Sequence, residues 1–152
     1  MESTSVSEVR KSAEEAFASG LYCAESVVLA LAKGQGIESE LLPKIATSFC
    51  GGMARSCGTC GALTGGVMGI GLALGRSKAG ESVQAAYVAT QQLIREFELT
   101  FGARDCHRLL GCDLGTPEGQ AMFREQRLSE RCAVYTAKAA EVAASVIAES
   151  QG

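Results

Sequence analysis

Seven cysteines are the residues of this 152-residue chain whose type and spacing can support chemistry. Cys57 and Cys60 form a C-x-x-C pair, and Cys50 lies upstream of it. The pair stands where a glycine-rich helix is expected to begin, and the backbone N–H groups and helix dipole at such a place favour a thiolate. A thiolate is both the nucleophile of disulfide exchange and the form of cysteine that binds metals. The spacing therefore predicts redox or metal chemistry.

The remaining cysteines are spread along the chain. Cys106 and Cys112 would point apart in an unbroken helix, with Cα atoms too distant for a disulfide. Because Gly111 is expected to end that turn, each is predicted to meet a cysteine from another segment. Cys132 stands at the start of the last helix, where a lowered pKa is expected on principle, although it could also be a small core residue. Cys23 lies on an apolar helix face, so we expect it to serve mainly in core packing.

The charged residues near these cysteines are less informative. His107 is the only histidine. It could help to deprotonate a thiol, but we expect it on the surface of a short turn. Arg55 could stabilise a thiolate at Cys57 or Cys60. A single histidine excludes a His-rich zinc site, and the absence of a βαβ pattern excludes a thioredoxin fold.

Composition and charge exclude several classes of protein. The formal net charge is -3 and no basic run occurs, so we expect no binding to nucleic acid. The N-terminal residues lack the features of a secretory signal, so a cytoplasmic location, where thiols stay reduced, is expected. Residues 56–75 are uncharged, yet their many glycines favour a buried helix over a membrane span.

The elements that must position the cysteines are all helical. We predict one all-α domain over residues 1–152, a compact bundle of about five main helices with short connections. Ser5 and Glu8 form a capping box, and Thr116 caps a helix with Pro117 at its first position. Helices are predicted over 6–18, 22–33, 40–49, 59–74, 81–101 and 129–148, with a helical turn over 105–111.

Three glycines of the fourth predicted helix share one face. Gly61, Gly65 and Gly69 are four residues apart. Glycine inside a helix costs roughly 1 kcal/mol relative to alanine, so another gain must offset it. Close approach of a second helix is the favoured explanation, and close approach of a cofactor is the alternative.

Four segments of the chain together resemble a known family. They contain Leu21-Tyr22-Cys23-Ala24, Cys60-Gly61-Ala62-Leu63-Thr64-Gly65, Cys106-His107-Arg108-Leu109-Leu110-Gly111-Cys112, and Arg131-Cys132-Ala133. In this order they resemble the redox-active proteins named for their C-GCAxxG-C-C pattern. The resemblance implies that Cys60, Cys106, Cys112 and Cys132 form the functional set, with Cys23 as a fifth candidate. Cys50 and Cys57 are additions to the family pattern, and His107 stands where arginine is commoner.

Three functions remain open from the sequence. The leading one is a thiol–disulfide oxidoreductase or electron relay that needs no cofactor, in which Cys60 attacks and Cys57, Cys112 or Cys132 resolves, with Cys106 in the same catalytic set. Its partner would be a redox protein or a small-molecule thiol, and a homodimer is compatible with the sequence. The second is an iron–sulfur or zinc protein with Cys60, Cys106, Cys112 and Cys132 as ligands and Cys50 or Cys57 as extra ones. The third is a cysteine-rich helical adaptor without chemistry.

Overall fold

The computed structural model describes residues 4–151 and confirms the all-α prediction for them. No β-strand occurs among these residues, apart from one isolated bridge. Five helices are long, which agrees with the predicted number of main helices. The elements are α1 (Val6–Ala18), α2 (Cys23–Gly34), α3 (Leu41–Ala46), a 3₁₀ turn (Thr47–Phe49), α4 (Cys50–Met53), α5 (Gly61–Leu74), α6 (Gln84–Phe101), α7 (Cys106–Leu110), α8 (Pro117–Glu125) and α9 (Ser129–Gln151).

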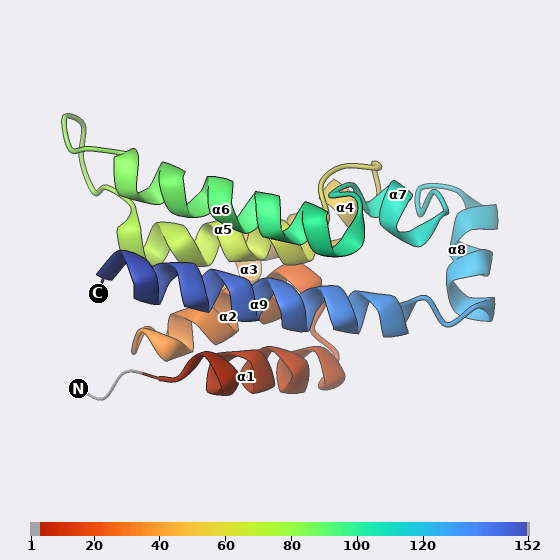
Figure 1. Ribbon diagram of the computed structural model, residues 1–152. Coiled ribbons are helices and arrows are strands. Elements are labelled where there is room, and N and C mark those ends of the chain that lie inside the picture. The colour runs from red at the N-terminus through yellow and green to blue at the C-terminus, as the bar shows by residue number, and fades with distance from the viewer. Residues whose placement is uncertain (1–3, 152) are drawn as a thin grey trace.

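Three helices form the centre of the bundle. Helices α2, α5 and α9 pack against one another, α1 covers α2 and α9, and α6 covers α5 and α9. Figure 1 shows that α2, α5 and α9 run in the same direction and begin at the same end of the bundle. The short helices α4, α7 and α8 lie at that end. The N-termini of the three central helices are therefore gathered beside these short segments.

The glycine face of α5 packs against α2, as expected from the spacing of its glycines. A Cβ atom at Gly65 would lie 2.7 Å from the carbonyl oxygen of Ala24, and one at Gly69 would lie 2.7 Å from the Cβ of Leu31. Real Cβ atoms do not approach other atoms so closely. The glycines therefore permit a helix separation that alanine would prevent, and close helix packing explains them.

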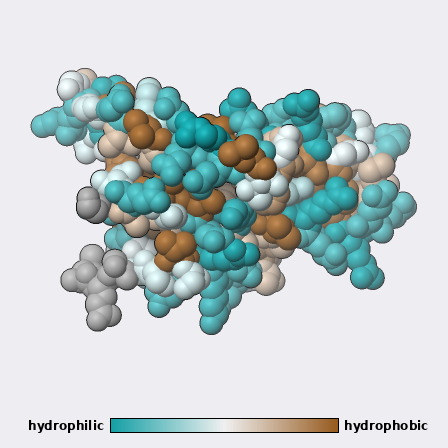
Figure 2. Space-filling model, in the orientation of Figure 1, coloured by the Kyte–Doolittle hydropathy of each residue, from teal (hydrophilic) through white to brown (hydrophobic). Residues whose placement is uncertain are grey.

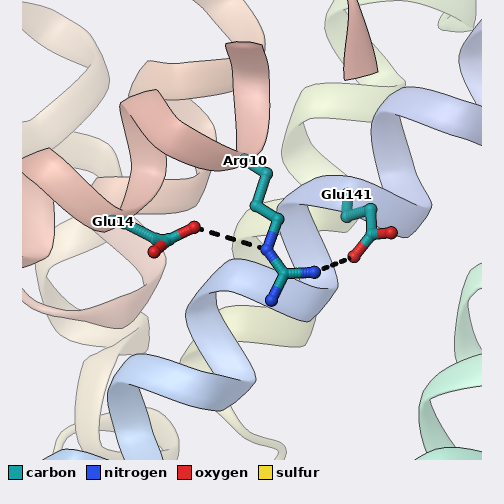
Figure 3. Close-up of polar contacts among 3 residues, drawn as sticks. All are labelled: Arg10, Glu14 and Glu141. Atoms are coloured by element: carbon teal, nitrogen blue, oxygen red, sulfur yellow. Dashed lines mark hydrogen bonds and ion pairs between the residues drawn. The ribbon is translucent and has the colours of Figure 1, made fainter. Parts of the chain in front are cut away.

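The predicted caps also form. The Ser5 side chain accepts from the backbone N–H of Glu8 at 3.2 Å, and the Glu8 carboxylate accepts from the N–H of Ser5. The Thr116 hydroxyl accepts from the N–H of Gly119 at 2.9 Å. Arg10 connects α1 to α9 by pairing with both Glu14, at 3.3 Å, and Glu141 (Figure 3).

Several boundaries and helix faces differ from prediction. Helix α5 begins at Gly61 rather than residue 59, and α6 begins at Gln84 rather than residue 81. The sequence predicts Ser129 as the cap of the last helix, but Ser129 is the first residue of α9. The later start of α5 arises because Thr59 pairs with Asp105 in the isolated bridge, which holds the chain extended just before Gly61.

The inward faces predicted for two helices are confirmed only in part. The apolar pattern predicts that residues 40–49 bury Leu41, Ile45, Ala46 and Phe49, and that residues 81–101 bury Val83, Tyr87, Thr90, Ile94, Phe97 and Phe101. Leu41 and Ile45 of α3 were expected to point inward but are exposed, because α3 ends at Ala46 and rests on α2 through Leu42 and Ala46. On α6 the buried residues are Ala89, Leu93 and Phe97, whereas Tyr87, expected on the buried face, is exposed.

The surface is mainly polar. In Figure 2 the hydrophobic residues of the visible face form separate brown patches among hydrophilic ones. Scattered exposed apolar residues of this kind are ordinary in folded proteins. No helix within residues 4–151 has the length and apolar character needed to cross a membrane.

Candidate thiol site

A cavity of about 640 Å³ lies among the residues at the end of the bundle where the central helices begin. We call it the thiol cavity, because five of the seven cysteines line it. They are Cys23, Cys50, Cys60, Cys106 and Cys132. Its volume lies within the range of about 300–1,000 Å³ that is usual for small-molecule sites.

The central helices bring three of these cysteines together. Cys23 is the first residue of α2, Cys60 directly precedes α5, and Cys132 lies in the first turn of α9. Because the three helices begin at the same end, residues more than a hundred positions apart in the chain, such as Cys23 and Cys132, share one cavity.

A short antiparallel contact places Cys60 beside Cys106. Thr59 pairs with Asp105, and the N–H of Cys60 donates to the carbonyl of Arg104 at 2.7 Å. The N–H of Cys106 donates to the carbonyl of Gly58 at 2.9 Å. Side chains alternate between the faces of paired segments, so Cys60 and Cys106 lie on one face as diagonal neighbours.

The turn after Cys50 has an uncommon backbone. The five residues 51–55 all have φ between +54° and +71°, and the N–H of Ala54 donates to the carbonyl of Cys50 at 3.0 Å. Residues 51–55 therefore form a left-handed turn, although residues 51–53 belong to the segment labelled α4. Three of its residues are not glycine, and each costs roughly 1–2 kcal/mol in this conformation.

The left-handed turn packs tightly against the segment that holds Cys106. A Cβ atom at Gly52 would lie 2.5 Å from the Cβ of Cys106 and 2.8 Å from the carbonyl oxygen of Gly58. Only glycine fits at this position. The turn thereby closes one side of the thiol cavity around Cys106.

Burial keeps the central thiols protonated. Burial is the main cause that raises the pKa of Cys60 to about 12, with the neighbouring Cys106 adding to it. Burial, and then Cys106, raises the pKa of Cys132 to about 12. The lowered pKa expected at helix starts is therefore wrong for both residues. Backbone N–H groups do favour the Cys60 thiolate, but desolvation outweighs them.

Cys106 interacts through charge with several of the other cysteines. Burial is the main cause that raises its pKa to about 11, and the charges of Cys112 and Cys57 raise it further. The charge of Cys106 in turn raises the pKa of both Cys60 and Cys132. Such mutual effects require short separations. The cysteines implied by the family resemblance are thus near one another.

Cys23 and Cys50 form a second contact. A hydrogen bond with the Cys23 thiol is the largest cause raising the pKa of Cys50, followed by burial. A Cβ atom at Gly61 would collide with the sulfur of Cys23 and would lie 3.1 Å from the Cα of Cys50. Cys23 is buried in the core, as expected, and it also lines the thiol cavity.

Cys57 and Cys112 lie outside the lining of the cavity. Cys57 is exposed with φ +62°, and its hydrogen bond with Asp113 raises its pKa. The structure therefore separates the two cysteines of the C-x-x-C pair, one outside and one inside the cavity. Cys112 is buried, and its burial raises its pKa while Arg131 lowers it. His107 is exposed on α7, as predicted.

The residues that complete the cavity were largely missed by sequence reasoning. The wall includes Tyr135 from α9, and Phe123 and Arg124 from α8. No spacing pattern connects these residues to the cysteines, so only the fold could reveal them. Arg55, predicted as a partner for a thiolate, lines the same cavity.

A metal ion would need several donor side chains arranged around one point. Within residues 4–151, no three His, Cys, Asp or Glu side chains are placed so that they could hold one ion. All seven cysteines are free thiols. The ligand set of Cys60, Cys106, Cys112 and Cys132 therefore stays a prediction, and no chemical step is derived from it.

Comparison with known proteins identifies a family that contains this chain. Residues 21–146 match the model of a family described as "Putative redox-active protein (C_GCAxxG_C_C)". No curated protein and no solved structure matches the chain. The matched segment contains all seven cysteines and covers most of the chain. The chain belongs to the C_GCAxxG_C_C family of redox-active proteins.

Proposed function

We propose that this protein is a thiol–disulfide oxidoreductase whose working thiols are Cys60, Cys106 and Cys132. The observation that supports the proposal is their arrangement. All three line one cavity, and the charge of Cys106 raises the pKa of the other two. In our proposal the protein acts in the cytoplasm with a partner that supplies or accepts a disulfide.

Cys106 is the best candidate for the attacking thiol. The antiparallel contact places it beside Cys60, and burial raises its pKa to about 11, as it raises those of Cys60 and Cys132 to about 12. This assignment differs from the prediction that Cys60 attacks. The thiolate attacks a sulfur of the partner disulfide and forms a mixed disulfide, and one partner thiol leaves.

The second half of the reaction resolves the mixed disulfide. Cys60 or Cys132 attacks the Cys106 sulfur, so an S–S bond forms within the protein and the second partner thiol leaves. Two electrons and two protons pass from the protein dithiol to the partner disulfide. Reduction of the protein is the same sequence in reverse.

Thiol counting with site mapping tests the proposal. Mild oxidation with diamide should remove two free thiols reversibly, and mass spectrometry should find Cys106 linked to Cys60 or Cys132. The Cys106→Ser variant should lose this reversible step, whereas Cys57→Ser, at an exposed position outside the cavity lining, should keep it. Unreactive thiols, or a disulfide that leaves out Cys106, would contradict the proposal.

A second candidate is a cysteine-ligated metal or iron–sulfur site. Burial, and then the charges of neighbouring cysteines, raises the pKa of Cys60, Cys106 and Cys132, and a bound cation would favour their thiolates. Anaerobic purification with metal analysis and an absorbance scan separates the two candidates. Stoichiometric metal with visible absorbance would support the second, and colourless metal-free protein with a titratable dithiol would support the first.

A further inference from the structure

Two of the proposed working thiols, Cys60 and Cys106, are poorly accessible to another protein. Cys60 is 5% exposed and Cys106 is 8% exposed. Thiol–disulfide exchange requires direct contact between the attacking sulfur and the disulfide. The cavity of about 640 Å³ has a size suited to a small molecule.

The formal charge of the cavity lining is entirely positive. Arg55 and Arg124 both line the cavity, and both are exposed, which places them at its rim. No Asp, Glu, Lys or His belongs to the lining. Within residues 4–151, neither arginine makes an ion pair. Guanidinium groups bind carboxylates well, so an anionic group would be stabilised at this rim.

Much of the cavity lining is apolar. Leu109 and Leu110 come from α7, Phe123 from α8, and Leu114 from the connection between them. Such a surface favours an apolar body and disfavours a molecule with many polar groups, because the polar groups would lose their hydrogen bonds to water. The cavity thus combines a cationic rim, an apolar wall and a set of thiols.

We propose that the partner of this site is a small amphipathic organic disulfide, with a carboxylate at one end of an apolar chain. This inference rests on the proposed thiol–disulfide function. The carboxylate pairs with Arg55 and Arg124, the chain contacts the leucines, and the disulfide reaches Cys106. Two electrons and two protons pass from the protein dithiol to the small molecule, whose S–S bond becomes two thiols while an S–S bond forms in the protein.

Three related probes separate binding from chemistry. Lipoate carries a carboxylate, an apolar chain and a cyclic disulfide. Octanoate lacks the disulfide, and lipoamide lacks the charge. Octanoate should bind the reduced protein in a calorimetric titration, and lipoate should oxidise the dithiol faster than lipoamide does. The difference should be about two- to fivefold, the size expected of an ion pair at an exposed site.

Paired variants identify the residues involved. The double variant Arg55→Gln, Arg124→Gln should lower the rate with lipoate to that with lipoamide and should weaken octanoate binding. Arg108→Gln is the matched control, because Arg108 is exposed on α7 but does not line the cavity. It should leave both measurements unchanged.

The possible results separate this inference from the proposed function. If diamide oxidises the dithiol reversibly but octanoate does not bind and lipoate has no advantage over lipoamide, the inference is overturned and the function stands. If octanoate binds in an arginine-dependent way but no thiol reacts, the function fails and only an anion site remains. If oxidised glutathione reacts as fast as lipoate, an apolar partner is excluded.

Discussion

The hydroxyl of Tyr135 donates a hydrogen bond of 3.0 Å to the backbone carbonyl of Leu109. This bond connects α9, which carries Cys132, to α7, which carries Cys106. The ring of Tyr135 also meets Phe101 edge-on, with centroids 4.8 Å apart, so the end of α6 joins the same contact. Tyr135 therefore helps to set the separation of two of the proposed working thiols.

Replacing Tyr135 by phenylalanine should weaken this connection while keeping the aromatic packing. We expect Tyr135→Phe to lower the free energy of unfolding by about 1 kcal/mol, because a buried carbonyl loses its partner. Urea unfolding measures the effect. Tyr87→Phe is the control, since Tyr87 is exposed and should change stability little. Equal effects of the two variants would show that the hydrogen bond contributes nothing.

The glycines of α5 should respond oppositely to the same substitution. Gly65→Ala should destabilise the protein by about 1–3 kcal/mol, because the added methyl group overlaps the backbone of Ala24. Gly71→Ala, on the same helix, meets nothing within 4 Å and should stabilise by up to about 1 kcal/mol. Thermal unfolding of both variants tests the pair. A tolerated Gly65→Ala would mean that close packing of α2 is not needed.

The buried thiols should make the protein less stable at alkaline pH. Burial raises the pKa of Cys60 and Cys132 to about 12 in the folded state, above the ordinary value of 9.0. Between these values the folded state binds more protons than the unfolded state, so the free energy of unfolding falls as pH rises. The stabilising contribution of the protonated thiols is complete below pH 9.0 and is lost as pH approaches about 12.

Unfolding in urea with reductant present, from about pH 8 to pH 11, measures this loss. The double variant Cys60→Ala, Cys132→Ala should lose less stability over that range than the unaltered protein, because fewer buried thiols ionise on unfolding. Parallel pH curves for the two proteins would exclude these cysteines as the cause.

A buried hydroxyl on α9 offers a stabilising substitution. Thr136 is fully buried, and its Oγ1 has no hydrogen-bond partner within the described residues. Thr136→Val keeps the shape and removes the unsatisfied group, so it should stabilise the protein by about 1 kcal/mol. Thr100→Val is the comparison, since the exposed Thr100 hydroxyl already donates to the carbonyl of Glu96 at 2.8 Å. A loss of stability in Thr136→Val would show that the hydroxyl is satisfied in solution.

Local features of the fold could be predicted from the sequence because they depend on neighbouring residues. The Ser5 capping box, the Thr116 cap and the glycine face of α5 each involve positions at most four residues apart. The buried faces of α3 and α6 were harder to predict from the sequence. Apolar residues occur on more than one side of these helices, and the choice of buried side depends on which neighbours they meet.

The sequence by itself determined that this protein is helical and that its chemistry lies in cysteines, because helix signals and residue types are local. Only the tertiary structure decided that Cys60, Cys106 and Cys132 line one cavity while Cys57 lies outside it. It also reversed the expected direction of the pKa shifts at Cys60 and Cys132. The reason is that burial and the distances between charges arise from packing segments far apart in the chain, which no local pattern records.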